Sequence, residues 1–261
     1  AHLGPSSHLP YKSIRPRETG MPSGGSRKGA KKGEARWWGV RFRDRRDAGR
    51  QLARALADLA PERPVVLGIP RGGLVVADEV AQALRAPLDV FGAAKVGAPF
   101  NRELALAAVA PGGVLVLNEE LASRLGLTAA DLERAAEERV KELAARLERL
   151  RGGRPPHPLR GRTVILVDDG VATGLTVAAA VQSLRREEPA RVVLAVPVAS
   201  PEALVDLSPL VDRLVCLRAP RGFRAVGEHY RDFAQVGDEE AAAILAAAAR
   251  RAQGEGAAGD G

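Results

Sequence analysis

The sequence predicts an α/β fold in which a doubly wound, mostly parallel sheet carries a small hood and a helical insertion. Short apolar runs alternate along the chain with longer segments that have the 3.6-residue period of helices. The runs are apolar at successive positions, which is typical of strands covered by helices on both faces. The 261 residues, 46% hydrophobic and 27% charged, suffice for one sizeable core.

The first secondary-structure element predicted in the chain is a surface helix. Apolar residues recur at helical spacing after Asp44, and the prolines of residues 61–64 end the run. Residues 65–69 then indicate a buried strand, and a Gly-Gly pair leads into the next helix. The further elements expected here are a helix at 74–84, a strand at 88–96, and strands at 104–109 and 114–117 that pair as a hairpin around 111–113.

The second half begins with the longest predicted helix, at residues 128–150. Its apolar residues step by three and four, and Glu137 and Glu142 each precede a basic residue by four positions. The helix either packs on its own domain or forms a dimer seam, and a length below four heptads favours packing. The remaining expectations are a linker at 152–161, strands at 163–167, 191–196 and 213–217, and helices at 175–185, 201–207 and 238–251.

Composition divides the chain into three parts. Residues 1–38 form a basic tail rich in Gly, Pro and Ser, which we expect to be disordered because it cannot bury enough apolar surface to fold. Residues 39–251 form the folded domain, and residues 252–261 a flexible C-terminal end. Six of the seven net positive charges lie in the tail. A nucleic-acid partner is therefore not expected for the folded part, which lacks a dense positive stripe.

Other composition features exclude several classes of protein. Apolar runs such as residues 192–198 fall far short of the roughly 20 residues that cross a bilayer, so no membrane span is expected. The single cysteine, Cys216, permits neither a disulfide framework nor a cysteine metal site. Four scattered histidines lack the spacing of zinc ligands. We expect a cytoplasmic protein with no metal site built from side chains alone.

The strongest functional signal follows the strand at 163–167. Asp168 and Asp169 precede a Gly/Thr turn that leads into a helix, and ligands of open parallel sheets bind beyond the carboxyl ends of strands. Backbone N–H groups at a helix start, with the hydroxyls of Thr173 and Thr176, make a cradle for a phosphate monoester. The two carboxylates are suited to accept hydrogen bonds from vicinal sugar hydroxyls. The alternative is that these residues only cap the helix.

The turn differs from the phosphate loop of nucleoside triphosphatases. That loop has four residues between its first two glycines and then Gly-Lys, whereas Gly170 and Gly174 enclose three and Leu175 stands in place of the lysine. A sugar phosphate is therefore favoured over a nucleoside triphosphate.

Residues 164–176 resemble the thirteen-residue phosphoribosyl-diphosphate (PRPP) signature of type I phosphoribosyltransferases. The signature has four apolar residues, two acids and a small-Thr-Gly-x-Thr phosphate loop, and the resemblance extends over most of residues 42–250. It implies a type I phosphoribosyltransferase-like fold, with Arg71, Asp168 and Asp169 as catalytic residues. The residues that the resemblance implies for the PRPP phosphate are Gly170, Val171, Ala172, Thr173, Gly174 and Thr176.

A second turn, residues 68–73, is similar to the diphosphate loop of the same family. Its glycines permit close approach of the backbone to a ligand, and the Arg71 guanidinium offers several hydrogen-bond donors to a diphosphate. The alternative is an ordinary turn between a strand and a helix, which has the same kind of sequence. Lys95 is either a point charge for the diphosphate or a solvated lysine at a strand end. The diphosphate-binding residues expected are Arg71, Gly72, Gly73 and Lys95. The resemblance also implies a mobile lid at residues 97–113.

The resemblance implies an enzyme of nucleotide metabolism, a glycosyltransferase that moves phosphoribose from Mg-PRPP to a nitrogen acceptor such as a nucleobase. Diphosphate leaves through an oxocarbenium-like transition state, and no covalent protein nucleophile is needed. Mg²⁺ is the expected cofactor, held by PRPP, with Asp168 and Asp169 contacting it through water rather than as direct ligands. A homodimer is expected by analogy alone.

The acceptor is less clearly indicated. Purine-salvage members carry an acid just before the Thr-Gly of the loop, where this chain has Ala172, so purine salvage is not expected. Phe223 and Tyr230 follow the last strand and are the expected stacking partners of a planar acceptor, with core packing as the alternative. His229 is either a proton donor or a surface histidine.

Two other functions stay open. A PRPP-binding regulator would keep the pocket without turnover, and a nucleic-acid-associated protein would act through the basic tail with salt-sensitive binding. The sequence identifies neither the acceptor nor whether PRPP is turned over.

Overall fold

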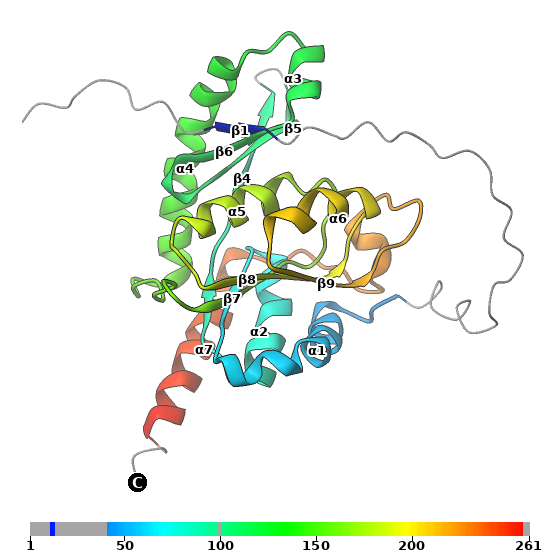
Figure 1. The fold of residues 1–261 in the computed structure, drawn as a ribbon. Coiled ribbons are helices and arrows are strands. Elements are labelled where there is room, and N and C mark those ends of the chain that lie inside the picture. Colours follow the sequence, from blue (N-terminus) through cyan, green and yellow to red (C-terminus); the bar gives the residue numbers. More distant parts are fainter. Residues whose placement is uncertain (1–10, 14–40, 99–100, 258–261) are drawn as a thin grey trace, which may run out of the picture.

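The computed structural model describes residues 11–13, 41–98 and 101–257. Two sheets form its framework, one of five strands in the order β3-β2-β7-β8-β9 and one of four strands in the order β1-β6-β5-β4. Helices cover both faces of the five-stranded sheet, and the four-stranded sheet lies beyond one of these layers (Figure 1). The predicted α/β class with a mostly parallel central sheet is confirmed.

The five-stranded sheet positions the functional turns, because all its strands are parallel and end at one edge. All residues of the two central strands before these turns are buried, which accounts for their apolar composition. Gly68 pairs with Val167, so the turns that follow these two strands lie side by side. The strands are β2 (Val65–Gly68), β3 (Leu88–Val90), β7 (Thr163–Val167), β8 (Arg191–Val198) and β9 (Arg213–Arg218).

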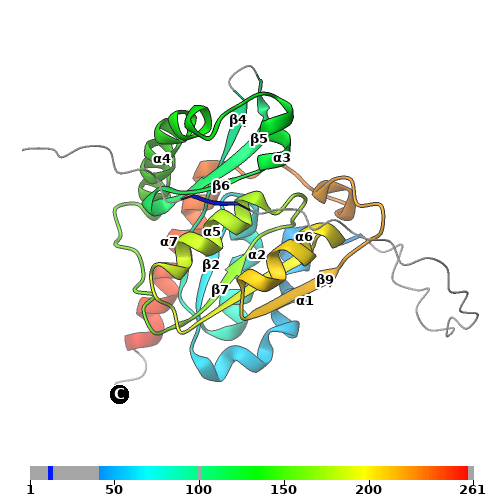
Figure 2. The ribbon, with the colours of Figure 1, turned by 45° about the horizontal axis from the view of Figure 1, so that its top comes forward.

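Alternate side chains of these strands enter two separate cores. Val66 and Ile165 pack on one face of the sheet, whereas Val164 and Leu166 pack on the other. The first face is covered by α1 (Arg45–Ala55), α2 (Gly72–Leu84) and α7 (Asp238–Ala257), and the second by α5 (Leu175–Arg185) and α6 (Pro201–Leu207) (Figure 2).

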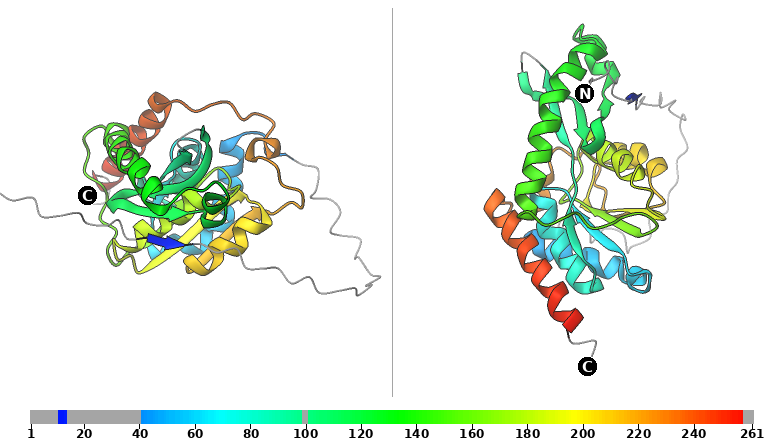
Figure 3. Two further views of the ribbon diagram at one scale, coloured as in Figure 1. Left: turned by 90° about the horizontal axis from the view of Figure 1, so that it is seen from above. Right: turned by 90° about the vertical axis from the view of Figure 1, so that its left-hand side faces the viewer.

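The helical insertion lies between β3 and β7 and carries most of the second sheet. The expected hairpin is confirmed, since its two strands pair antiparallel across a 3-10 turn at Pro111–Gly113. The expected long helix is α4, which Thr128 caps, and it runs from the second sheet to α7 (Figure 3). The elements are β4 (Ala94–Ala98), β5 (Asn101–Ala110), β6 (Val114–Leu117), α3 (Glu119–Arg124), which was not predicted, and α4 (Ala129–Arg151).

Two expectations for this region are wrong. Residues 88–96 are not one strand, because β3 and β4 belong to different sheets and the chain leaves the first sheet at 91–93. A Cβ on Gly92 would lie 2.8 Å from Cδ of Pro70, so only glycine allows the close passage there. Residues 97–113 are not a loop, because residues 101–110 form β5 and its side chains from Leu106 to Ala110 are buried. Residues 99–100 lie outside the described residues.

The hood forms where the segment before α1 meets the segment after β9. The N–H of Phe42 donates to the His229 carbonyl at 2.9 Å, and the N–H of Arg231 donates to the Phe42 carbonyl at 2.8 Å. Phe42 is fully buried beside Val198 and Tyr230. The hood is therefore anchored to the edge of the sheet beside the functional turns.

The ends of the chain differ from expectation in two places. Residues 11–13, within the expected disordered tail, form β1 (Tyr11–Ser13) and pair with the open edge of β6. Helix α7 continues to Ala257, beyond the predicted boundary at residue 251. The rest of the predicted tail up to residue 38 lies outside the described residues. Within the described part, no helix is long and apolar enough to cross a membrane.

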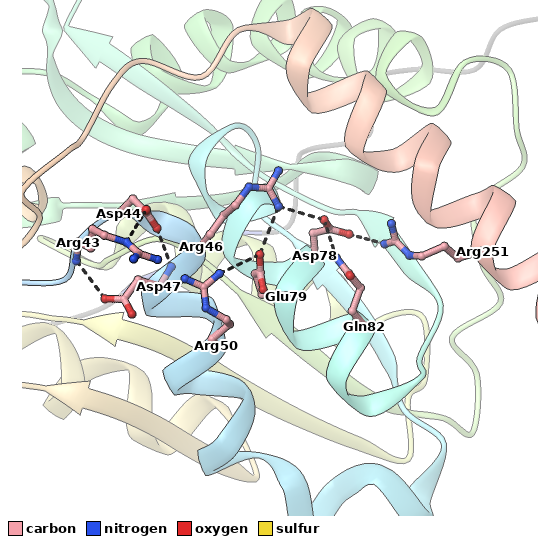
Figure 4. Close-up of polar contacts among 9 residues, drawn as sticks. All are labelled: Arg43, Asp44, Arg46, Asp47, Arg50, Asp78, Glu79, Gln82 and Arg251. Atoms are coloured by element: carbon pink, nitrogen blue, oxygen red, sulfur yellow. Dashed lines mark hydrogen bonds and ion pairs between the residues drawn. The ribbon is translucent and has the colours of Figure 1, made fainter.

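A buried carboxylate ties together the three helices on the first face of the sheet. Asp78 of α2 is 5% exposed and accepts hydrogen bonds from Gln82, at 3.0 Å, and from Arg251 of α7 (Figure 4). Arg46 of α1 lies 3.6 Å from Asp78 and also contacts Glu79. Burying a carboxylate this deeply carries a large desolvation penalty. The hydrogen bonds and ion pairs with its partners offset that penalty.

We expect Asp78→Ala to lower the free energy of unfolding by about 1–2 kcal/mol, because it removes the acceptor shared by Gln82, Arg46 and Arg251, while the guanidinium groups left behind stay partly hydrated. Denaturant unfolding measures this difference. Asp58→Ala is the matched control, since it removes an exposed partner of Arg213, and its effect should be smaller. Equal losses for the two variants would contradict the role of Asp78.

Candidate active site

A cavity of about 790 Å³ opens at the edge of the five-stranded sheet, where β2 and β7 end. Its walls come from residues 69–72 after β2, residues 93–95 at the start of β4, one face of α4, and residues 168–174 after β7. Hood residues 233–236 close a further side. This is the position at which open parallel sheets bind their ligands.

The two carboxylates after β7 differ in their partners. Asp169 Oδ2 accepts a hydrogen bond from Nε of Arg45 at 2.7 Å, and this ion pair is largely buried. The N–H of Asp169 donates to Asp168 Oδ1 at 2.8 Å. Arg45 also donates to the carbonyl of Ala234 at 2.7 Å and lies over the ring of Phe233. Asp169 is therefore fixed by the hood, whereas Asp168 has no cationic side chain bonded to it among the described residues.

Burial and the neighbouring Asp169 carboxylate hold the pKa of Asp168 well above its usual range, against the opposing charge of Lys95. Two carboxylates this close repel each other when both are charged. A hydroxyl donor or a cation beside Asp168 relieves that repulsion, so the pair is prepared for a ligand that supplies one.

Gly72 and Gly73 allow the two functional turns to touch. A Cβ on Gly72 would lie 1.9 Å from Asp169 Oδ2, and one on Gly73 would lie 2.9 Å from the Cα of Asp168. No side chain fits at either position without moving the acidic pair. The glycines after β2 are thus required by the carboxylates after β7, which joins the two sequence signals into one site.

The loop after Asp169 presents the start of α5 to the cavity. Gly174 adopts φ +78° and begins the helix with no side chain capping its N–H groups. Thr173 and Thr176 both line the cavity. The loop is held from behind, since Val171 is bridged to Ala199 and the Ser200 hydroxyl donates to the Ala172 carbonyl at 2.6 Å. A rigid loop with uncapped N–H groups and two hydroxyls is suited to a phosphate.

The cationic residues expected for a diphosphate also reach the cavity. Arg71 lies in its wall, and its Nη1 is 3.8 Å from Asp238 Oδ1. Lys95 of β4 is exposed in the same wall. The residues predicted for the sugar, the phosphate and the diphosphate therefore line one cavity, except Gly73, which lies behind the wall against the backbone of Asp168.

The predicted acceptor residues lie elsewhere, and here the expectation needs correction. Tyr230 is 2% exposed, with its ring between Phe42 and Phe233 and its hydroxyl donating to the Asp169 carbonyl at 2.5 Å. Phe223 stacks on His229 at 5.2 Å, outside the cavity wall. Tyr230 is therefore part of the packing of the hood, and Phe223 is not among the residues that line the cavity.

Sequence reasoning missed several residues of the wall. They are Arg45 of α1 and Arg139 and Arg146 of α4. Phe233, which follows the predicted acceptor residues along the chain, is the aromatic side chain that lines the cavity among the described residues. The arginines lie on helices far from the motifs along the chain, and no local pattern distinguishes them from solvated arginines. The seven-residue spacing of Arg139 and Arg146, two turns apart on one face, was the available signal.

Comparisons with known proteins agree with this geometry. The family model described as "Phosphoribosyl transferase domain" matches residues 44–226. Two curated proteins of Mycobacterium tuberculosis, from strains CDC 1551 / Oshkosh and ATCC 25618 / H37Rv, are each named a putative phosphoribosyl transferase. Each is 47% identical to this chain over 204 residues, which is 78% of this chain and 46% of the relative. The chain thus spans about half the length of these relatives.

A solved structure is also closely similar. The protein TT1426 from Thermus thermophilus is 52% identical and superposes with a TM-score of 0.67, covering 79% of this chain and 98% of that chain.

The raised pKa of Asp168 predicts a stability effect with a definite sign. A carboxyl whose pKa is raised by folding destabilises the fold as pH rises through that pKa, so Asp168→Asn should be more stable than the parent at pH 8. A gain on the order of 1 kcal/mol would raise Tm by about 2–4 °C, and the gain should shrink at pH 4.5, because less of the charged form that burial disfavours is present at lower pH. Thermal unfolding at both pH values measures it.

Asp212→Asn is the control of opposite sign. The hydrogen bond from Arg185 holds the pKa of Asp212 below its usual range, so this charge stabilises the fold at neutral pH and its removal should lower Tm at pH 8. A lower Tm for Asp168→Asn at pH 8 would contradict the account of the acidic pair.

Proposed function

The chain belongs to the phosphoribosyl transferase domain family, and from this premise we propose that it transfers phosphoribose from Mg-PRPP to a nitrogen acceptor and releases diphosphate. One observation carries the proposal: the acidic pair, the phosphate loop and the Arg71 turn face one cavity in the order that the parts of PRPP require. The reaction would belong to nucleotide metabolism. The single cysteine is typical of a reducing compartment, and the proposed location is the cytoplasm.

Each part of PRPP has a partner in this proposal. The 5′-phosphate lies on the uncapped N–H groups at the start of α5, with hydroxyls from Thr173 and Thr176. The ribose hydroxyls donate to Asp168 and Asp169, which relieves the repulsion between the carboxylates. The diphosphate meets Arg71 and Lys95 on the other side of the cavity.

The donor groups present fit a magnesium ion that arrives with the substrate. Among the described residues, no group of three or more acidic, histidine or cysteine side chains is arranged to hold a metal alone. The raised pKa of Asp168 reflects repulsion between two adjacent carboxylates, which a nearby cation would relieve. Mg²⁺ is commonly bound in this way, by one or two carboxylates together with substrate phosphates. Bound there, Mg²⁺ would neutralise charge on the leaving diphosphate.

The chain contributes position and charge to the transfer. The phosphate loop and the acidic pair hold the sugar, and Arg71 stabilises the negative charge that develops on the diphosphate. The carboxylates beside the ribose stabilise the positive charge of an oxocarbenium-like transition state, and they do so most strongly when Asp168 is ionised. No side chain needs to form a covalent bond.

The acceptor subsite in this proposal lies against Phe233 rather than Phe223 and Tyr230. Phe233 and Val226 line the cavity from the hood. The guanidinium of Arg45 lies 3.8 Å from the centre of the Phe233 ring and fixes its orientation. An apolar aromatic wall with no acid at position 172 suits a planar nitrogen heterocycle that needs no proton from the loop.

Calorimetric titration with PRPP, with and without Mg²⁺, tests the ligand class. We expect binding that depends on Mg²⁺, and we expect Asp168→Asn with Asp169→Asn to abolish it while leaving a folded protein, because both negative charges and one acceptor oxygen of each side chain are lost. Asp212→Asn, outside the cavity, is the matched control and should bind PRPP as the parent does. Undiminished binding by the double variant would remove the acidic pair from the site.

Turnover is measured separately, as diphosphate released from PRPP in the presence of a panel of nucleobases and related heterocycles. Release that requires one acceptor supports the transferase. Tight PRPP binding without release for any acceptor would favour a regulator that senses PRPP.

A further inference from the structure

Asp238, at the start of α7, lies between two arginines that come from distant parts of the chain. Its Oδ1 is 2.5 Å from Nη2 of Arg146 on α4 and 3.8 Å from Nη1 of Arg71 in the turn after β2. Both arginines line the cavity. One acidic oxygen is thus shared by two guanidinium groups at the wall of the site.

Arg146 has donor capacity that the fold does not use. Its Nε is buried and, among the described residues, has no hydrogen-bond partner. A buried donor without an acceptor is costly, and a bound ligand is one of the physical reasons for which native proteins keep such a group. Because α4 belongs to the insertion and not to the sheet that carries the motifs, Arg146 is an addition that this insertion makes to the cavity.

We propose that Arg146 is a second arginine of the diphosphate subsite. In the absence of ligand, Asp238 Oδ1 occupies the position between Arg146 and Arg71 that a diphosphate oxygen takes when the ligand binds. The proposal rests on the proposed function, in which Arg71 contacts the diphosphate. Since Asp238 Oδ1 accepts from Arg146 and lies 3.8 Å from Nη1 of Arg71, an anion with several oxygens at the same point can contact both guanidinium groups with little movement of α4 or of the turn after β2.

Displacement of Asp238 is feasible because all three side chains are partly exposed, with exposed fractions of 34% for each arginine and 46% for Asp238. Ion pairs of this exposure are weak, whereas a diphosphate brings several charges and can bond each guanidinium with two oxygens. The released Asp238 carboxylate remains near solvent and near the positive end of α7, where a negative charge is favoured. The hydrogen bond from Arg146 holds the pKa of Asp238 below its usual range, so it competes as an anion at neutral pH.

The test is calorimetric titration of the full chain with inorganic diphosphate and Mg²⁺, with ribose 5-phosphate present to fill the phosphate loop. We expect Arg146→Gln to weaken diphosphate binding about tenfold or more, because it removes hydrogen bonds to a charged ligand. Asp238→Asn should tighten binding about three- to tenfold, because it removes the competing anion. In the variant that already carries Arg146→Gln, the gain from Asp238→Asn should be smaller.

Two controls separate this role from a structural one. Arg134→Gln alters an exposed arginine of the same helix, outside the cavity, and should leave diphosphate binding unchanged. Ribose 5-phosphate lacks the diphosphate, so its own affinity should be the same for Arg146→Gln, Asp238→Asn and the parent. Thermal unfolding of each variant verifies that it is folded. If Asp238→Asn does not fold, the diphosphate affinity of Arg146→Gln alone still tests the inference.

The outcomes distinguish this inference from the proposed function. Unchanged diphosphate affinity in Arg146→Gln, or weaker binding in Asp238→Asn, overturns the inference even if PRPP binds the parent. Diphosphate binding that follows the expected pattern in a protein that does not bind PRPP supports the subsite and overturns the proposed function. If the parent binds neither diphosphate nor PRPP, both are overturned.

Discussion

The close contact between the turn after β2 and the acidic pair after β7 is the constraint on which the site depends. Asp168 and Asp169 lie so near Gly72 and Gly73 that no Cβ fits between them. Adjacent parallel strands bring the two turns to the same edge, and glycines then let a cationic turn and an acidic turn face one cavity. The proposed binding of a sugar between two phosphate groups depends on that contact.

The hood supports this arrangement by fixing one acid and leaving the other without a bonded cation. Arg45 pairs with Asp169 and Tyr230 holds its carbonyl, while Asp168 stays close to a like charge. A fold with two adjacent charged carboxylates is less stable than the same fold with one of them neutral. A ligand that supplies hydroxyls or a cation recovers this stability. The hood thus links Phe233 in the wall of the cavity to the geometry of the acidic pair.

The parts of the fold that sequence could predict are those with a local signal. Buried strands such as β2 and β7 are apolar throughout, α4 has a full helical period and a capping residue, and the Asp-Asp-Gly/Thr turn carries its chemistry within a few residues. The parts that sequence could not predict depend on contacts between distant segments. The break at Gly92 is set by Pro70, and the burial of Tyr230 by Phe42 and Phe233. Arg45 and Arg146 reach the cavity only through tertiary packing.

The central claim is that one ligand spans both turns at once, and phosphorus NMR of PRPP measures this most directly. The 5′-phosphate and the diphosphate give separate resonances, and each reports on its own surroundings. With Mg²⁺ present, the account predicts that both sets of resonances shift or broaden together as protein is added. A change confined to one set, or no change in either, would contradict the claim that the phosphate loop and the Arg71 turn form a single PRPP site.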